Sequence, residues 1–361
     1  MQSPPIAPGP YLIDSAWMTQ ALRASGDLPH GEVTEVHSRP VGNGLVGDSF
    51  RFELTYAGAP DTAPASVIGK FPAEDPASRA SGAGLRLYLR EVGFYRDIAP
   101  TVDISTPRPI YAEINPETHD FTLILEDLGP ARAGDQLAGC SVEDAATALK
   151  EAAALHAPRW GDVSLLQIDW LNPANSEMNG QIAAALPMVV AAFKDRYQGQ
   201  LEPECLAIVD RLPAAVVAMQ GVSDFPVTLQ HADFRLDNIL FDVQGGTRRM
   251  GTLDWQTITL GAALTDVSYF LSAGLSPETR REHERDLVGL YHAQLLQRGV
   301  RNYPLEAAWR DYQRFAVHGV LMGVFSAMAV ERTDRGDALF LKMTRGGCLQ
   351  ALDHGTFEIW S

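Results

Sequence analysis

Side chains able to do phosphate chemistry gather in one stretch of the sequence, from His231 to Asp254. His231 and Asp233 form a His-x-Asp pair, Asn238 stands five residues after Asp233, and Asp254 ends a short apolar run, MGTLD. Carboxylate and amide oxygens are hard ligands suited to Mg²⁺, which proteins usually hold through one or two carboxylates together with phosphate oxygens. The stretch therefore has the side-chain types needed to hold a divalent metal on a nucleoside triphosphate while a third group orients a substrate hydroxyl.

Short strands are expected to position these groups. Apolar residues alternate before His231, a second apolar run follows Asn238, and a glycine-containing turn leads to the run that ends at Asp254. Two antiparallel strands would place Asn238 and Asp254 at neighbouring positions, with Asp233 on the preceding loop. A polar hairpin with ordinary Asx turns would use the same residue types, so the order of the whole set carries the functional interpretation. The residues that define these elements are Val227, Leu229, Ile239–Phe241, Gly245, Gly246 and Met250–Leu253.

The pattern HxDxxxxN followed by a strand-end Asp resembles the catalytic and metal loops of protein-kinase-like phosphotransferases. The longer string HADFRLDNILF…LDWQTITLGAALTDVSYFL is similar to the aminoglycoside/choline kinase group, and within it to the ecdysteroid-kinase-like branch. The resemblance extends over roughly Val36 to Gly347. It implies that Asp233 accepts or orients the proton of the substrate hydroxyl, and that Asn238 and Asp254 hold Mg²⁺ bridging the phosphates of ATP.

The resemblance also implies roles for the neighbours of these groups. His231 is expected to pack beneath the loop as a core histidine rather than to act as a base. Asp266, in GAALTDVSYFL, is expected either to brace the catalytic loop or to be the N-cap of an apolar helix. Arg235 is expected either to contact phosphate or to be exposed. Trp255 and Gln256 replace the Phe-Gly pair of protein kinases, and no Ala-Pro-Glu segment follows, which argues against a protein substrate.

A glycine-rich segment upstream is the first test of this interpretation. Gly42, Gly44 and Gly47 form a literal G-x-G-x-x-G, which a dinucleotide-binding fold or a plain hairpin turn could also contain. A dinucleotide fingerprint must open a helix, but the residues Ser49–Tyr56 alternate and are aromatic, as in a strand. Strand, glycine turn and strand form the hairpin that covers phosphates in kinases. Asp48, directly after the last glycine, is an acidic departure from that pattern.

A lysine and a glutamate complete the predicted nucleotide site. Lys70 ends the apolar run SVIGK, where a lysine is ordinarily a surface residue, whereas the strand lysine of kinase folds pairs with the α- and β-phosphates and with a helix glutamate. A helix is predicted over Ala80–Ile98 from its apolar stripe. Glu91 lies in the middle of that helix and is the expected partner of Lys70, while Glu74 and Glu113 are weaker candidates outside the stripe.

The segment Thr122–Leu128, TLILEDL, is predicted to be the last strand of a small β-rich lobe. Gly129 and Pro130 follow it and break regular structure. In kinase-like folds the adenine edge bonds to backbone groups of this linker, so Glu126 and Leu128 are the expected nucleotide contacts.

Helical periodicity dominates the rest of the chain. Ser141 is a predicted N-cap, and Ser276 starts a helix that Gly299 ends. Further amphipathic stretches are predicted at Leu305–Ala329 and Asp337–Asp353. The expected fold is α+β: a bilobal protein-kinase-like architecture with a small β-rich N-lobe, residues 1–128, and a larger, mainly helical C-lobe, residues 129–361.

Composition fits a globular enzyme and excludes other classes. The chain has 361 residues, 46% of them hydrophobic, which is long enough for two lobes with separate cores. No apolar run is long enough to span a membrane, the Pro-rich start lacks the features of a signal peptide, and three scattered cysteines give no disulfide framework. We therefore expect a cytoplasmic protein. The net charge of −16 argues against a nucleic-acid partner, and it either steers a cationic substrate or is solvated surface.

The favoured function is ATP-dependent transfer of phosphate to a hydroxyl of a small molecule: a steroid-like alcohol, an antibiotic or another hydroxylated metabolite. One alternative is a catalytically silent, nucleotide-binding pseudokinase, although such a protein has no need of Lys70, Asp233, Asn238 and Asp254 together. Another is a nicotinamide oxidoreductase. No motif identifies the acceptor pocket, and its candidate aromatic walls, each more often a core residue, are Trp160, Trp170, Tyr269, Phe270 and Trp309.

Overall fold

The structure, a computed structural model, describes residues 3–42, 46–171, 176–220, 222 and 224–360. The chain divides into two compact units. The first, here called the β-rich unit, contains Met1–Pro100, Thr106–Pro130 and Leu253–Thr257. The second, the helical unit, contains Thr101–Ser105, Ala131–Thr252 and Ile258–Ser361. The short segment Leu253–Thr257 thus belongs with the β-rich unit although the residues on either side belong to the helical one.

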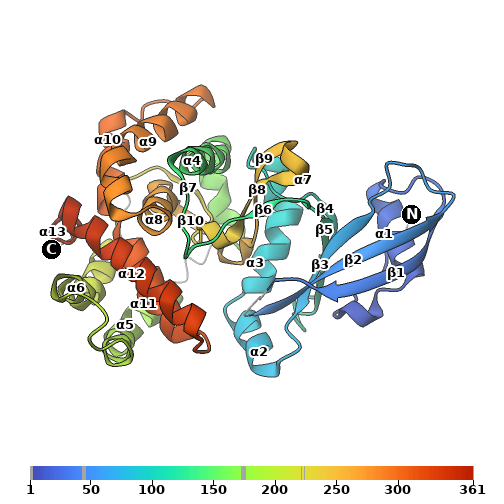
Figure 1. Cartoon of the computed structure of the whole chain (residues 1–361), viewed down its shortest axis with the longest axis horizontal. Coiled ribbons are helices and arrows are strands. Elements are labelled where there is room, and N and C mark those ends of the chain that lie inside the picture. Colours follow the sequence, from blue (N-terminus) through green and yellow to red (C-terminus); the bar gives the residue numbers. More distant parts are fainter. Residues whose placement is uncertain (1–2, 43–45, 172–175, 221, 223, 361) are drawn as a thin grey trace. The chain divides into compact units, whose positions relative to one another are not determined.

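A five-stranded antiparallel sheet forms the β-rich unit, in the order β1-β2-β3-β5-β4 (Figure 1). The hairpin predicted around the glycine-rich segment is confirmed, because Pro40 at the end of β1 pairs with Phe50 in β2. A strand follows Gly47 where a dinucleotide-binding fingerprint needs a helix, so the oxidoreductase interpretation of these glycines is wrong. The strands are β1 (Glu32–Pro40), β2 (Gly47–Ala57), β3 (Ser66–Pro72), β4 (Pro109–Ile114) and β5 (Phe121–Glu126).

An N-terminal helix shares the core of this sheet. Helix α1 (Ser15–Ser25) begins at Asp14, whose carboxylate accepts a hydrogen bond from the Trp17 N–H. A 3₁₀ turn, η1 (Pro10–Leu12), precedes it. The helix buries its apolar face against residues of the strands, and burial of such side chains contributes about 1.5–3 kcal/mol each. The core shared by helix and sheet includes Met18, Leu22, Phe52, Val67, Phe71 and Ile124.

The single helix predicted over residues 80–98 is wrong. The chain forms α2 (Pro76–Gly84), α3 (Leu87–Gly93) and a π-helical turn, η2 (Phe94–Ile98), which a 3₁₀ turn, η3 (Ala99–Thr101), follows. Arg86 breaks the helix with a φ of 59°, and Leu85, predicted to be on the buried stripe, is 48% exposed. The glycines of the sequence SGAG before the break lower the helix propensity there, a local effect that the apolar periodicity did not report.

Two small sheets in the helical unit carry the motif residues. Strand β7 (Val227–Gln230) pairs with β10 (Thr259–Ala262), and β6 (Arg132–Ala133), β8 (Ile239–Asp242) and β9 (Arg248–Thr252) form a three-stranded sheet in the order β6-β8-β9. The antiparallel pair predicted around the glycine turn is confirmed, because Ile239 pairs with Thr252. A single turn, α7 (Val243–Gly246), connects these strands.

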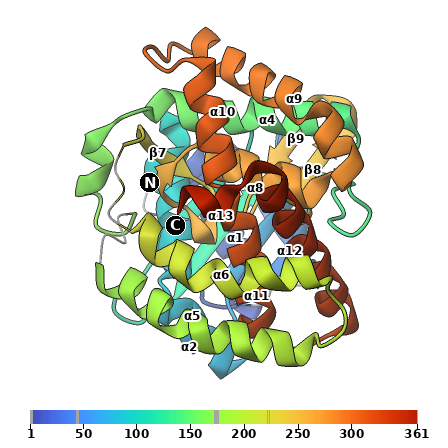
Figure 2. The ribbon, with the colours of Figure 1, turned by 90° about the vertical axis from the view of Figure 1, so that its left-hand side faces the viewer.

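Helices pack around two cores in this unit. One core lies among α4, α8, α9 and α10 together with β8 and β9, and the other among α5, α6, α11 and α12, which lie side by side in Figure 2. The predicted N-caps Ser141 and Ser276 are confirmed. The predicted helix Leu305–Ala329 is interrupted at Phe315 and Ala316. The helices are α4 (Val142–His156), α5 (Ser176–Arg196), α6 (Pro203–Met219), α8 (Leu264–Gly274), α9 (Pro277–Gln297), α10 (Leu305–Arg314), α11 (Val317–Ala329), α12 (Asp334–His354) and α13 (Thr356–Ile359), with 3₁₀ turns η4 (Ala157–Arg159), η5 (Val163–Gln167), η6 (Leu236–Asn238) and η7 (Trp255–Thr257).

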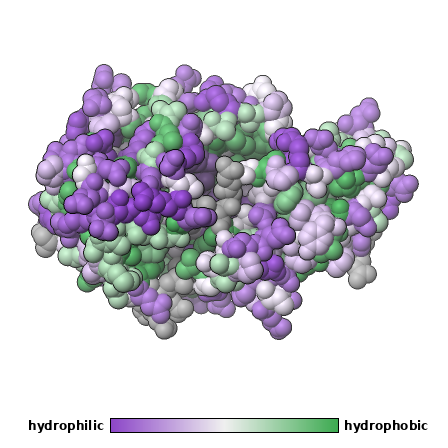
Figure 3. All heavy atoms as spheres, turned by 60° about the horizontal axis from the view of Figure 1, so that its bottom comes forward, coloured by the Kyte–Doolittle hydropathy of each residue, from purple (hydrophilic) through white to green (hydrophobic). Residues whose placement is uncertain are grey.

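The α+β class is confirmed: an antiparallel sheet comes first, and a mainly helical region follows. Among the described residues, no helix has the length and apolar character needed to cross a membrane. The face drawn in Figure 3 mixes hydrophilic and apolar residues, with the hydrophilic ones prevailing over much of it.

Candidate active site

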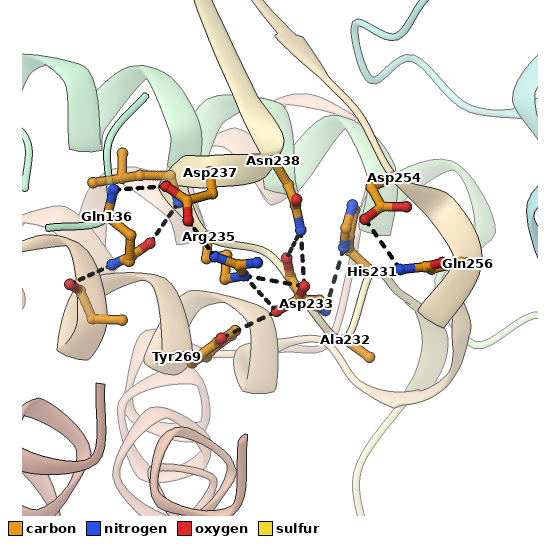
Figure 4. Close-up of polar contacts among 12 residues, drawn as sticks. Gln136, His231, Ala232, Asp233, Arg235, Asp237, Asn238, Asp254, Gln256 and Tyr269 are labelled. Atoms are coloured by element: carbon orange, nitrogen blue, oxygen red, sulfur yellow. Dashed lines mark hydrogen bonds and ion pairs between the residues drawn. The ribbon is translucent and has the colours of Figure 1, made fainter. Parts of the chain in front are cut away.

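The loop between β7 and β8 holds Asp233 through its carboxylate (Figure 4). Asn238 Nδ2 donates to Oδ2 at 2.9 Å, and the Tyr269 hydroxyl donates to Oδ1 at 3.1 Å. Arg235 Nε lies 3.1 Å from each oxygen. A carboxylate has about four lone-pair sites, so these donors occupy all of them. Asp233 is nevertheless 15% exposed, and its orientation is fixed from three sides.

Asn238 is oriented by the same contacts. Its amide nitrogen also donates to the backbone carbonyl of Asp233 at 2.8 Å. Both partners are acceptors, so the nitrogen must face them and the amide oxygen faces away. That oxygen has no hydrogen-bond partner within the described part of the chain. Asn238 therefore presents one unengaged hard oxygen beside Asp233.

Arg235 is neither exposed nor unpaired. Its side chain is 19% exposed, and its Nη1 donates to Asp237 Oδ2 at 2.7 Å in addition to the contacts with Asp233. Burial by itself would lower the pKa of Arg235, but the adjacent carboxylates outweigh it and hold the pKa above its usual range. The expectation of an exposed side chain is wrong, and contact with phosphate stays a prediction.

Tyr269 in α8, one of the aromatic candidates for the acceptor pocket, contacts Asp233 directly. Its ring is fully buried, and burial, together with the charge of Asp233, raises the pKa of Tyr269 well above its usual range. The hydroxyl therefore stays protonated and donates a hydrogen bond to Asp233. The other candidates lie in or against the cores of the helical unit or are otherwise buried: Trp160, Trp170, Phe270 and Trp309.

Asp266, fully buried in α8, braces the loop backbone. Its carboxylate accepts from the His231 N–H at 2.8 Å and from the Ala232 N–H at 2.9 Å. It lies inside the first turn of α8, whose N-cap is Ala263, so the alternative N-cap role is wrong. Burial by itself would raise the pKa of Asp266, but bonding and charge from His156 and His231 outweigh it and hold the pKa below its usual range.

His231 is buried, as predicted for a core histidine. Its Nδ1 accepts from the Asp233 N–H at 3.3 Å. A backbone N–H can only donate, so Nδ1 is the acceptor of this bond, which ties the ring to the backbone of the loop.

Three residues that hold the loop were missed in the sequence. His156, at the end of α4, contacts Asp266 Oδ2 through Nε2 at 3.2 Å and the Tyr291 hydroxyl through Nδ1 at 2.7 Å. His318, in α11, donates from Nε2 to the Ala232 carbonyl at 2.8 Å. His318 is the one ionisable residue of a mainly apolar helix, and His156 is the last residue of α4; the sequence contains no stronger signal for either.

Gln136 is the third missed residue. Its Oε1 accepts from the Leu236 N–H at 2.8 Å, its backbone N–H donates to Asp237 Oδ1 at 2.9 Å, and its Nε2 donates to the Ala273 carbonyl at 2.5 Å. The side chain is fully buried. It belongs to an irregular segment with no periodicity, so no sequence pattern could have indicated it.

In the β-rich unit the structure brings Lys70, Glu91 and Asp254 together. Lys70 Nζ donates to Glu91 Oε1 and lies 3.3 Å from Asp254 Oδ1. Glu91, in α3, is 3% exposed. Burial by itself would lower the pKa of Lys70, but Glu91 and Asp254 outweigh it and hold the pKa above its usual range. Lys70 is therefore charged, and the weaker partner candidates Glu74 and Glu113 are wrong.

Asp254 is held by its own short segment. Gln256 Nε2 donates to Asp254 Oδ2 at 3.2 Å, and the backbone of Asp254 has a φ of 64°. Trp255, fully buried, stacks on Phe94 with ring centroids 3.7 Å apart and donates from Nε1 to Thr106 Oγ1 at 3.0 Å. The tryptophan anchors the segment, so the Asp254 side chain reaches Lys70 from a fixed backbone.

Two of the three glycines predicted to contact the nucleotide lie among the described residues. Gly42 follows β1 with a φ of 74°, and Gly47 begins β2, where a Cβ would lie 3.2 Å from the Phe71 carbonyl. Gly44 lies outside the described residues. Asp48 Oδ2 accepts from the Glu74 N–H at 2.8 Å, which gives this acidic residue a structural partner.

Glu126 is the last residue of β5, and Leu128 follows it by two residues. The Glu126 N–H donates to the Arg108 carbonyl at 2.9 Å, and Leu128 is 3% exposed. Neither backbone group of Leu128 has a hydrogen-bond partner within the described ranges of the chain.

The family described as "Phosphotransferase enzyme family" matches residues 77–311, more than half of the chain. No curated protein sequence matches this chain. Among solved structures, ethanolamine kinase of Plasmodium vivax is 11% identical, with a TM-score of 0.52 over 86% of this chain and 82% of that one. Aminoglycoside 2'-phosphotransferase-IIIa, solved with GDP, is 13% identical, with a TM-score of 0.52 over 92% and 99%.

Choline kinase from Cryptosporidium parvum Iowa II is 10% identical, with a TM-score of 0.50 over 90% of this chain and 89% of that one. At these identities the solved structures share the fold with this chain, and the family match supplies the relationship in sequence. The protein belongs to the phosphotransferase enzyme family.

Proposed function

We propose that this chain transfers the γ-phosphate of ATP to a hydroxyl group of a small molecule, with Asp233 as the catalytic residue. The observation that carries this proposal is the Asp233 carboxylate, which is partly exposed while Asn238, Arg235 and Tyr269 fix its orientation. Such a carboxylate can accept the proton of a substrate hydroxyl and aim the oxygen for attack, the role of the catalytic-loop aspartate in phosphoryl transfer.

The donors and acceptors of the β-rich unit fit a nucleotide. Lys70 carries a positive charge held by Glu91, as a group that pairs with phosphates requires. The unengaged N–H and C=O groups of Leu128 can form hydrogen bonds with the edge of a purine base. Gly42 and Gly47 allow the backbone to approach phosphates closely.

Asn238 and Asp254 are the proposed Mg²⁺ ligands. The unengaged Oδ1 of Asn238 and the carboxylate of Asp254 are hard oxygens of the kind that Mg²⁺ prefers. When bound, Mg²⁺ neutralises charge that develops on the transferred phosphate.

The names of the solved relatives suggest the chemical class of the acceptor. Solved relatives are named for ethanolamine, choline and aminoglycosides, and the sequence string around Asp233 resembles the ecdysteroid-kinase-like branch. All are small molecules that carry hydroxyl groups. We therefore propose a hydroxylated metabolite, steroid-like alcohol or antibiotic as the acceptor.

A screen of hydroxyl compounds for acceptor-dependent ADP release tests the proposal. Asp233→Asn keeps the size of the side chain but removes the base, and it is expected to lower turnover by at least about a hundredfold while MgATP still binds. Asp242→Asn, a change to an exposed carboxylate at the end of β8, is the matched control and should be as active as wild type. Equal turnover in Asp233→Asn and wild type would refute the assignment, and nucleotide binding with no turnover on any acceptor would favour the pseudokinase.

A further inference from the structure

A partly buried ion pair in the β-rich unit lies beside the linker residues. Asp127, directly before Leu128, has a side chain that is only 9% exposed. Arg51 of β2 donates from Nη2 to Asp127 Oδ1 at 2.9 Å, and its Nε lies 2.6 Å from Oδ2. The Nη2 contact is a hydrogen bond, and the Nε contact adds charge attraction to the second carboxylate oxygen.

Two further donors complete the surroundings of this carboxylate. Ser66, the first residue of β3, donates its hydroxyl to Asp127 Oδ2 at 2.7 Å. The Gly129 N–H donates to Oδ1 at 2.9 Å. Burial by itself would raise the pKa of Asp127, but Ser66, Gly129 and Arg51 outweigh it and hold the pKa below its usual range. One charged group therefore ties together two strands and the backbone that follows the linker.

The backbone on the other side of Leu128 is also fixed. Glu126 is paired with Val67 of β3, and its N–H donates to the Arg108 carbonyl. A Cβ at Gly129 would lie 3.2 Å from both Arg51 Nη2 and Asp127 Oδ1, so the chain approaches the ion pair as closely as glycine allows. Leu128 lies between Asp127 and Gly129, which are both held by hydrogen bonds, while its own peptide groups have no partner among the described residues.

We propose that Asp127 is a positioning residue for the nucleotide base: with Arg51 and Ser66 it sets the direction in which the peptide groups of Leu128 face the purine edge. This inference rests on the proposed use of a nucleotide. Asp127 acts through the backbone and does not touch the ligand. The arrangement separates base recognition, which depends on Asp127, from phosphate recognition, which depends on Lys70.

Binding measurements on the full chain test this separation without an acceptor substrate. In Asp127→Asn an amide N–H replaces one acceptor oxygen and faces the donors of Ser66, Arg51 or Gly129, so the backbone of the linker must shift. The affinities for MgATP and for AMP are expected to fall by about tenfold each. The affinity for magnesium tripolyphosphate, which has no base, is expected to be unchanged, and this binding also shows that the variant is folded.

Companion variants sharpen the test. Ser66→Ala removes one of the hydrogen bonds and should give a smaller loss of the same kind, while Lys70→Met should weaken tripolyphosphate and MgATP more than AMP, which carries only the α-phosphate. Glu53→Gln, which breaks an exposed ion pair between β1 and β2, should leave all three affinities unchanged. A lower melting temperature in Asp127→Asn with unchanged AMP affinity would overturn the inference, as would an equal loss for AMP and tripolyphosphate. If wild type binds none of the three ligands, the proposed function fails together with it.

Discussion

Removing the carboxylate of Asp266 should destabilise the helical unit more than any surface substitution. In Asp266→Ala three donors lose their acceptor: the N–H groups of His231 and Ala232, at 2.8 and 2.9 Å, and His156 Nε2, at 3.2 Å. A buried donor left without a partner costs about 1–3 kcal/mol. Relief of the buried negative charge offsets part of the sum, which leaves an expected loss of about 4 kcal/mol.

The matched comparison uses urea denaturation followed by tryptophan fluorescence. Asp266→Asn keeps one acceptor oxygen and should lose about 2 kcal/mol of the free energy of unfolding. Asp242→Ala removes a carboxylate that is 63% exposed and paired with Arg132 at 3.1 Å, and such surface pairs contribute about 0–1 kcal/mol. A loss in Asp266→Ala no larger than that in Asp242→Ala would refute the view that this carboxylate supports the catalytic loop.

Two further predictions concern the same loop. Ala232 has a φ of 65°, a conformation that costs an L-residue about 1–2 kcal/mol. Ala232→Gly should therefore stabilise the protein by about 0.5–1 kcal/mol in urea denaturation, even though glycine has more freedom in the unfolded chain. The control Ala146→Gly, inside α4, should destabilise the protein by about 1 kcal/mol, and a change of the same sign in both variants would contradict this reasoning. The pKa of Asp266 is lower in the folded protein than its usual value, so its contribution is complete above about pH 4 and is lost as the pH falls through the folded-state pKa. The difference in unfolding free energy between wild type and Asp266→Asn should therefore be constant from about pH 7 to 5 and shrink below about pH 4; a difference that grows with acid would exclude this sign.

The sequence predicted the elements whose signals are local. Alternation identified β2 and β7, an apolar run identified β8, and serine caps identified α4 and α9, because each such signal lies within a few residues of the feature that it predicts. The break at Arg86 was missed because the apolar period continued across it. Glycine content, which weakens a helix without changing its period, was the signal that mattered there.

Residues that act over long sequence distances have no local signal, and the bracing role of Asp266 was predicted only through the resemblance, as one of two alternatives. Asp266 braces residues that precede it by more than thirty positions, and His156 reaches it from a separation of 110. The pair of Lys70 and Glu91 was found because the resemblance supplied the pairing and periodicity supplied a helix, although the helix bounds were wrong. Gln136 and His318 have neither a motif nor a period, so only the fold brings them to the loop.

The contacts of Asp233 also limit how a substrate can reach it. Its oxygens already accept from Asn238, Tyr269 and Arg235, so an incoming hydroxyl needs one acceptor position to become vacant. Asn238 is bonded twice to the same residue, and the Tyr269 ring is fully buried, so neither can turn away without loss elsewhere. Arg235 shares one N–H between both oxygens at 3.1 Å, and it can give up either bond and keep the other together with Asp237. On the proposed function, the acceptor hydroxyl would therefore replace one of the two contacts of Arg235 Nε, while Asn238 and Tyr269 hold the carboxylate.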